Sequence, residues 1–156
     1  MKINGKHDVD VPLGFVARVL VDFQGWERAA LRRGLDVRRT DRLAEPGLGA
    51  TWTARFSYRG KPRVIDFEVI EIDPTGRIVV AFTGKSAQGT ATLVPLAMSA
   101  QRTRISASLD VQARTLSARL LFQSMRLARQ RVVRKFEQRL AQFGGEVETR
   151  FRAASG

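Results

Sequence analysis

The chain has no cysteine, and only one histidine and one tyrosine occur among its 156 residues. Without cysteine there is no disulfide framework, no thiolate nucleophile and no thiolate metal site. One histidine with no cluster of carboxylates is a poor basis for a metal site, so we expect neither a metal nor another cofactor. The absence of cysteine is also typical of a reducing compartment, and we expect a cytoplasmic protein.

Long apolar runs and nucleotide-binding motifs are missing too. No segment approaches the roughly 18 uninterrupted apolar residues of a membrane span, and residues 1–6 lack the hydrophobic stretch of a signal peptide. Phosphate-binding glycine loops, zinc-ligand spacings and a Ser-His-acid set are absent, which argues against nucleotide hydrolysis and peptidase chemistry. Hydrophobic residues still make up 44% of the chain, enough for one domain with a real core.

Acidic residues are few relative to basic ones: 15 against 27, for a net charge of +12. Such a field favours anionic partners, namely nucleic acid, anionic lipid headgroups or acidic small molecules. Arginine outnumbers lysine, which a GC-rich genome also produces. The charge by itself therefore selects no partner.

Period-two alternation dominates the first three quarters of the chain. Residues 2–11 place Ile3, His7 and Val9 on one face, which predicts a strand, and Pro12 ends it. Helical spacing then predicts short helices at about 12–22 and 26–33. Six further strands are expected at about 35–45, 51–59, 63–73, 77–83, 87–96 and 102–112. Short turns between them imply an antiparallel meander that the first strand completes.

A long helix is predicted from Thr115 to Phe143, because apolar side chains there recur at helical spacing within an arc of about 140°. Between Arg114 and Arg139 it carries eight basic residues against one acid, Glu137. We expect its main apolar face to pack on the sheet. Residues 144–156, which begin with a glycine pair, are expected to form a flexible tail after a single domain at 1–143. The main face comprises Leu121, Phe122, Met125, Ala128, Val132, Val133, Phe136, Leu140 and Phe143.

A second apolar stripe lies on the far side of this helix and consists of Leu116, Leu120 and Leu127. One sheet does not account for it. It can pack on the two short helices, form a dimer contact, or touch a membrane surface beside the arginines. Simple packing is the interpretation we favour.

The order of these elements, with three local motifs, resembles the SRPBCC superfamily, also called START-like or Bet v 1-like. Residues 1–12 are similar to its opening strand, which ends in a proline and runs into a short helix. Residues 49–60 resemble its glycine-led third strand, and residues 71–74 the turn after the fourth. The resemblance covers residues 1–143. It implies an α+β helix-grip fold, in which a curved antiparallel sheet of about seven strands wraps a long C-terminal helix.

The resemblance also implies a hydrophobic cavity between sheet and helix. Members of the superfamily bind lipids, sterols, polyketides, quinones or hormones, and some catalyse cyclisation or dehydration. From strand parity and helix phase we predict which residues face the cavity, unless their side chains fill it. These are Trp52, Phe56, Tyr58, Ile65, Phe67, Phe82, Leu93, Ile105, Ala107 and Leu109 from the sheet, with Met125, Val132 and Phe136 from the helix.

Two polar side chains are candidates for a role beside this cavity. His7 shares the inner face of the first strand and is a candidate acid or base, although a packing role is the simpler interpretation. Arg39 shares parity with Leu35 and Val37, so it is a candidate rim contact for a ligand carboxylate, or else points into solvent. No catalytic residue is otherwise assigned.

Three functions follow as hypotheses. The first is binding or transport of a hydrophobic small molecule (lipid, quinone or polyketide-like), without catalysis. The second is a cyclase or dehydratase that uses His7 as acid or base. The third is peripheral contact with an anionic membrane, at its inner face, through Arg119, Arg126 and Arg134. Nucleic acid is disfavoured, because aromatic residues do not interleave with the exposed basic ones.

Overall fold

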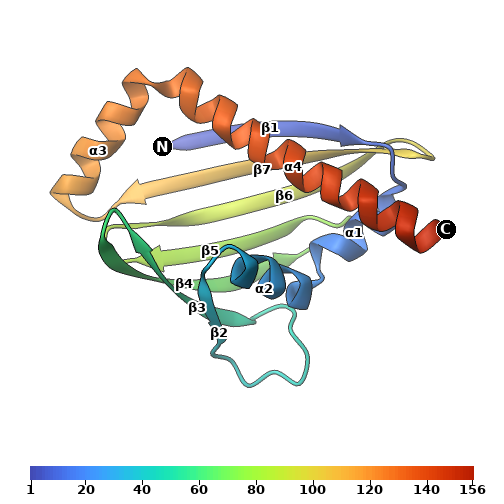
Figure 1. The fold of residues 1–156 in the computed structure, drawn as a ribbon, viewed down its shortest axis with the longest axis horizontal. Coiled ribbons are helices and arrows are strands. Elements are labelled where there is room, and N and C mark those ends of the chain that lie inside the picture. The colour runs from blue at the N-terminus through green and yellow to red at the C-terminus, as the bar shows by residue number, and fades with distance from the viewer.

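The computed structural model describes residues 1–156 and contains one seven-stranded antiparallel sheet and four helices (Figure 1). The α+β helix-grip arrangement expected from the sequence is confirmed. The elements are β1 (Lys2–Val9), α1 (Leu13–Leu20), α2 (Phe23–Arg32), β2 (Asp36–Arg39), β3 (Thr51–Tyr58), β4 (Lys61–Ile72), β5 (Ile78–Gly84), β6 (Ala87–Ser99), β7 (Arg102–Ala113), α3 (Leu116–Leu127) and α4 (Arg129–Ser155).

The strands follow the order β1-β7-β6-β5-β4-β3-β2, so β2 to β7 form the predicted meander and β1 joins its free edge beside β7. In this register His7 lies opposite Ile105, and Ile105 lies opposite Pro95. One face of the sheet is covered: α4 runs diagonally across β1, β7 and β6, with α1 and α2 on the same side (Figure 1). The cavity predicted from the sequence therefore has to lie on this face.

The helix pair α1 and α2 begins at two capping residues. Pro12 occupies the N-cap of α1 in an extended conformation, so the helix begins at Leu13. The side chain of Asp22 accepts a hydrogen bond from the backbone N–H of Gly25 (3.1 Å), so α2 begins at Phe23, three residues before the predicted start. The second strand is shorter than expected, because β2 ends at Arg39 and residues 40–50 form a loop.

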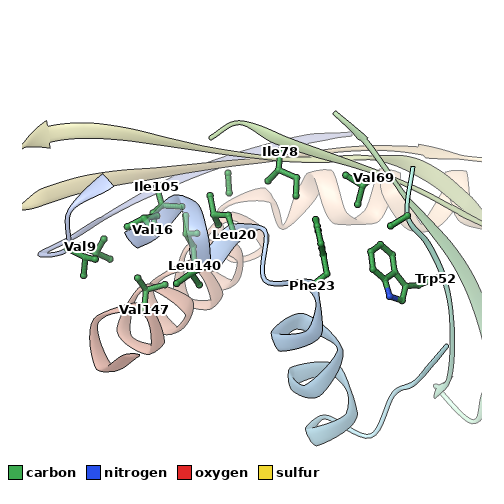
Figure 2. Packing of buried hydrophobic residues seen from close by; sticks show 14 residues of the cluster. Val9, Val16, Leu20, Phe23, Trp52, Val69, Ile78, Ile105, Leu140 and Val147 are labelled. Carbon is green, nitrogen blue, oxygen red and sulfur yellow. The ribbon is translucent and has the colours of Figure 1, made fainter. Parts of the chain in front are cut away.

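The core lies where α1 and α4 meet the sheet. Val16 and Leu20 of α1, with Leu140 and Val147 of α4, belong to one buried cluster with Ile105, and Phe23 of α2 extends this cluster to β3 (Figure 2). Phe23 and Trp52 have ring centroids 5.5 Å apart. Burial of each of these side chains contributes about 1.5–3 kcal/mol to the free energy of unfolding. The core thus fixes both α2 and α4 relative to the sheet.

The prediction of one continuous helix from Thr115 to Phe143 is wrong in two respects. The first is that the helix is interrupted at Ala128. That residue ends α3 and caps α4 with φ −106° and ψ 27°. The local sequence contains neither glycine nor proline, so propensity does not predict the break. Tertiary contacts accompany it: Ala118 is buried near the end of β7, and Arg129 donates to the backbone oxygen of Lys2 (3.2 Å) at the start of β1.

The second error concerns residues 144–156, which are not a flexible tail but continue α4 to Ser155. Val147 is fully buried, and the ring of Phe151 meets that of Phe15 edge-on at 5.2 Å. Gly144 is buried because α4 passes close to β1, and a Cβ there would overlap the imidazole of His7. The glycine that suggested a frayed end instead permits close packing of helix on strand.

Packing of the second stripe on the short helices, which we favoured, is also wrong. Leu116, Leu120 and Leu127 are 72%, 56% and 93% exposed. The helix α3 contacts only β7 and α4 to any extent and projects from one end of the sheet (Figure 1). The stripe thus lacks a partner within the chain.

Candidate functional site

A cleft of about 370 Å³ lies between α2 and α4, above the centre of the sheet. Its floor is formed by Leu93 of β6 and Ala107 of β7, which are direct neighbours in the sheet. Across the next pairing, Ala107 lies opposite Gly5 of β1. The space above Gly5 is taken by the ring of Phe136, which would lie 3.2 Å from a Cβ at position 5. The small residue therefore lets α4 pack close to the sheet, and Phe136 forms part of the cleft wall.

Two helices form the walls of the cleft, each with lining residues at helical spacing. On α2 the lining residues Trp26, Ala29 and Ala30 recur at i, i+3 and i+4, and on α4 Phe136, Leu140 and Phe143 follow the i, i+4, i+7 pattern. Each set is one face of an amphipathic helix. The remaining lining residues are Leu35, Arg33, Arg139 and Glu146.

An aromatic pair joins the two walls. The rings of Trp26 and Phe143 are stacked at 5.0 Å with an interplanar angle of 21°. The indole N–H of Trp26 donates to the backbone oxygen of Leu20 (3.0 Å), which fixes the ring although it is 38% exposed. The pair thus presents a rigid apolar surface to anything that occupies the cleft.

Charged groups occur at the rim of the cleft and not on its floor. Arg33 of the α2 C-terminus, Arg139 and Glu146 are all exposed. Neither arginine forms an ion pair within the chain. A guanidinium group forms bidentate hydrogen bonds with carboxylate and phosphate. The arrangement is an apolar slot with two arginines and one glutamate at its entrance.

Of the residues predicted to face the cavity, Leu93, Ala107 and Phe136 line this cleft. Trp52 and Ile105 are on the predicted face but are buried in the core. Tyr58 is 53% exposed at the end of the β3–β4 hairpin. The others are half-buried and lie outside the lining of the cleft: Phe56, Ile65, Phe67, Phe82, Leu109, Met125 and Val132.

His7 is on the inner face of β1, as predicted, but α4 covers it. Gly144 lies over its ring, so close that a Cβ at position 144 would be 3.0 Å from Nε2 of His7. His7 makes no side-chain hydrogen bond and does not line the cleft. Its position is that of a packing residue between β1 and α4.

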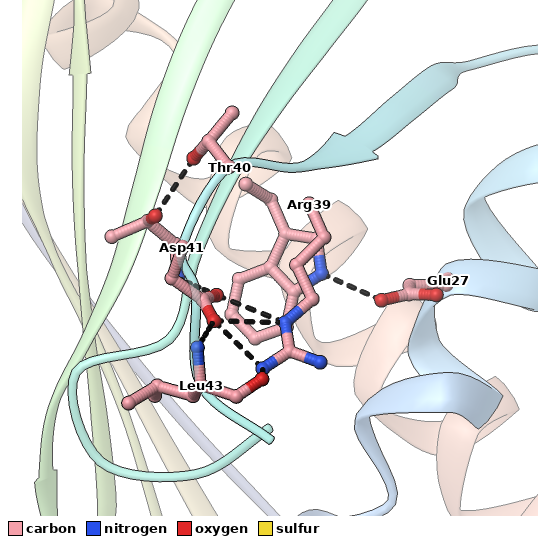
Figure 3. Close-up of polar contacts among 7 residues, drawn as sticks. Glu27, Arg39, Thr40, Asp41 and Leu43 are labelled. Carbon is pink, nitrogen blue, oxygen red and sulfur yellow. Dashed lines mark hydrogen bonds and ion pairs between the residues drawn. The ribbon is translucent and has the colours of Figure 1, made fainter. Parts of the chain in front are cut away.

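Arg39 is half-buried and engaged in a polar cluster beside α2 (Figure 3). Its guanidinium group donates to Asp41, with a shortest distance of 2.7 Å, and to the backbone oxygen of Leu43 (2.9 Å). Asp41 also accepts from the backbone N–H groups of Thr51 (2.8 Å) and Leu43 (2.9 Å). The cluster closes the 40–50 loop, so the guanidinium of Arg39 is not free at the rim.

The electrostatics of this cluster follow from its hydrogen bonds. Donation from Arg39, and then from the N–H groups of Thr51 and Leu43, holds the pKa of Asp41 well below its ordinary value of 3.8. The same bond raises the pKa of Arg39. Nearby, the indole N–H of Trp52 donates to Glu27 of α2 (2.7 Å), which ties the cleft wall to β3 (Figure 3).

Sequence reasoning missed the α2 wall and one inward arginine. The spacing of Trp26, Ala29 and Ala30 was a usable signal, but the predicted cavity lining included residues of the sheet and the long C-terminal helix only. Arg63 pairs with Phe56 and shares its face, and its Nε is buried without a hydrogen-bond partner. Its parity with Ile65 and Phe67 was the signal that would have identified it.

No protein-family model and no curated protein matches the sequence. Solved structures do share its fold. The aromatase/cyclase ZhuI from Streptomyces sp. R1128 is 20% identical with a TM-score of 0.72, and the match covers 100% of this chain and 98% of that one. A norcoclaurine synthase point mutant from Thalictrum flavum, in complex with a transition state analogue, is 11% identical with a TM-score of 0.70, covering 100% and 96%.

A START superfamily protein from Mycobacterium smegmatis is also similar, at 12% identity and a TM-score of 0.57, with 91% of this chain and 98% of that chain covered. These similarities establish the START-like, Bet v 1-like fold of the SRPBCC superfamily that the sequence suggested. At such identities they establish the fold alone.

Proposed function

We propose that the protein binds an apolar small molecule in the cleft between α2 and α4, with a polar or anionic end of that molecule at Arg33 and Arg139. The observation that carries the proposal is the distribution of polarity, with an apolar floor and walls and charge at the rim. A volume of about 370 Å³ is within the range of roughly 300–1,000 Å³ typical of small-molecule sites. The fold supports it, since a START superfamily protein is among the similar structures.

The ligand class follows from the same contacts. Burial of apolar ligand surface supplies about 25 cal/mol per Å², and the stacked Trp26–Phe143 pair suits a planar or polyunsaturated body. A carboxylate, phosphate or quinone oxygen at the entrance would accept hydrogen bonds from the two guanidinium groups. Amphiphiles of the lipid, quinone or polyketide kind combine these features.

A cyclase-type enzyme is the second candidate, favoured by similarity over the full chain to an aromatase/cyclase. It requires an acid or base at the reacting atoms. The cleft floor offers none, and His7 lies under α4, outside the lining. We therefore prefer binding without catalysis. If a polyketide-like substrate is turned over by the wild-type protein and not by His7→Gln, with the urea midpoint unchanged, the enzyme is the better description.

Two fluorescent probes test the binding proposal. Neutral N-phenylnaphthylamine and anionic anilinonaphthalene sulfonate should both saturate the protein, and Arg33→Gln/Arg139→Gln should weaken only the anionic probe, by on the order of tenfold. Arg42→Gln/Arg55→Gln removes the same charge from exposed sites elsewhere and serves as control. Native mass spectrometry of an organic extract should then identify the resident molecule. Failure of both probes to saturate would refute the proposal.

A further inference from the structure

The projecting helix α3 has an outward face that combines exposed leucines with unpaired arginines. Leu116, Leu120 and Leu127 lie within about 40° of one another around the helix axis. Arg119 and Arg126 lie about 60–80° from Leu116 on one flank, and neither forms an ion pair. Ser117 and Ser124 are on the other flank. We call Leu116, Arg119, Leu120, Arg126 and Leu127 the α3 face.

The opposite side of α3 already has partners. Ala118 is buried, and Phe122 and Met125 are half-buried toward the rest of the molecule. Packing within the domain therefore requires the opposite side of α3 to be apolar, and does not require this of the α3 face. Leucines exposed to the extent of 56–93% cost free energy in water unless something covers them. The helix carries more apolar surface than its own domain uses.

The whole molecule shows the same excess of exposed surface. Its accessible area is 10208 Å², whereas a folded monomer of 17.4 kDa exposes about 7,900 Å² on average. A projecting helix that contacts only β7 and α4 contributes to this excess (Figure 1).

We propose that the α3 face docks on the surface of a bilayer rich in anionic phospholipid. Its leucines would enter the boundary between headgroups and acyl chains, and its arginines would bind the phosphates. No helix of the protein has the length and apolarity to cross a membrane, so the contact is peripheral. The proposal does not depend on what the cleft binds.

The charge around the α3 face favours anionic phospholipid as its partner. No acidic residue occurs between Asp110 and Glu137, and the first turns of α4 add Arg131 and Arg134, both exposed. A continuous cationic segment of this kind is attracted to the negative surface potential of anionic lipid. Arg134, one of the three arginines predicted from the sequence to meet a membrane, extends the charged segment beyond α3.

The same features disfavour two other occupants. A second copy of the chain, joined by a two-fold axis at this face, would bring Arg119 and Arg126 against the same residues of its partner, with no acids to offset them. A nucleic acid would use the arginines but leave the three leucines uncovered, and the outward side of α3 has no aromatic residue on which a base can stack. A lipid surface accounts for both the apolar and the cationic residues.

Cosedimentation of the full chain with vesicles tests the proposal. The protein should bind vesicles of phosphatidylcholine and phosphatidylglycerol in about a three-to-one ratio and bind pure phosphatidylcholine weakly, with affinity falling as salt rises. Arg119→Gln/Arg126→Gln should reduce binding by on the order of tenfold or more. Leu116→Gln/Leu120→Gln/Leu127→Gln should reduce it by a similar factor at every salt concentration.

Matched control variants distinguish binding by the α3 face from a general effect of net charge or of exposed apolar area. Leu31→Gln/Leu48→Gln/Leu96→Gln removes three similarly exposed leucines elsewhere, and Arg42→Gln/Arg55→Gln removes two exposed arginines. Both control proteins should bind the anionic vesicles as the wild type does. The leucine triple variant of α3 should retain N-phenylnaphthylamine binding, which shows that the fold and the cleft are intact.

Three outcomes would overturn the proposal. Equal binding to both vesicle types, or none, removes the anionic membrane. Tight binding to duplex DNA that is insensitive to the leucine triple identifies nucleic acid as the partner. A dimer in sedimentation velocity that the leucine triple dissociates, without vesicle binding, identifies a second copy.

Discussion

Gly144 of α4 lies directly over the imidazole of His7 on β1, and a side chain at position 144 would overlap that ring. This contact joins the last helix to the first strand, 137 residues earlier in the chain. It fixes the path of α4, and thereby the positions of Phe136, Leu140 and Phe143 in the cleft wall. The only histidine of the chain is thus part of the support of the cleft.

Gly144→Ala should lower the free energy of unfolding by about 1–3 kcal/mol, because the added Cβ forces His7 or α4 to shift. Gly145→Ala is the matched control: nothing lies within 4 Å of a Cβ there, and replacing glycine within an exposed helix should stabilise the protein by up to about 1 kcal/mol. Urea denaturation measures both. Equal effects of the two substitutions would show that α4 does not approach β1 as described.

Asp41→Asn should destabilise the 40–50 loop at neutral pH, because Arg39 then loses its carboxylate partner. Folding lowers the pKa of Asp41, so the ionised carboxylate stabilises the folded protein. This stabilisation is complete at pH values above the unfolded pKa of 3.8. That contribution is lost as pH falls below 3.8 toward the lower folded pKa. The difference in urea midpoint between the wild type and Asp41→Asn should therefore narrow below about pH 4. A difference that is constant with pH would contradict the pairing.

Trp26 should report occupancy of the cleft, because it lines the cleft whereas Trp52 is buried beneath α2. An apolar ligand that reaches Trp26 should change the tryptophan emission of the wild type and of Trp52→Phe. The change should disappear in Trp26→Phe. If it instead disappears in Trp52→Phe, the ligand occupies the part of the sheet near β3 and not the cleft.

The strands were predictable because alternation is a local property. Trp52, Ala54 and Phe56 share one face in sequence and structure alike, and every strand of the meander was expected near its observed position. The break at Ala128 and the helical course of residues 144–156 were not predictable in this way. The contacts that accompany them join α3 and α4 to β7, β1 and α1, which are distant in the sequence, and local periodicity does not report such contacts.

The candidate site was predictable to the extent that it lies on the sheet. Parity identified Leu93 and Ala107 as inward residues, and helix phase identified Phe136. Which inward residues line an open cleft and which are packed in the core depends on where α2 and α4 lie. Trp52 and Phe67 face inward as expected, yet neither lines the cleft.

Titration of Ala107→Leu with N-phenylnaphthylamine tests the central claim most directly, since the added carbons project from the floor into the cleft. We predict that the wild type binds the probe saturably and that Ala107→Leu weakens binding by on the order of tenfold or more. Ala30→Phe, which fills the cleft from the α2 wall, should do the same. Ser108→Leu, on the opposite face of β7, should bind as the wild type does, and urea midpoints show that each variant folds. Unchanged affinity in both filled variants would contradict a ligand site between α2 and α4.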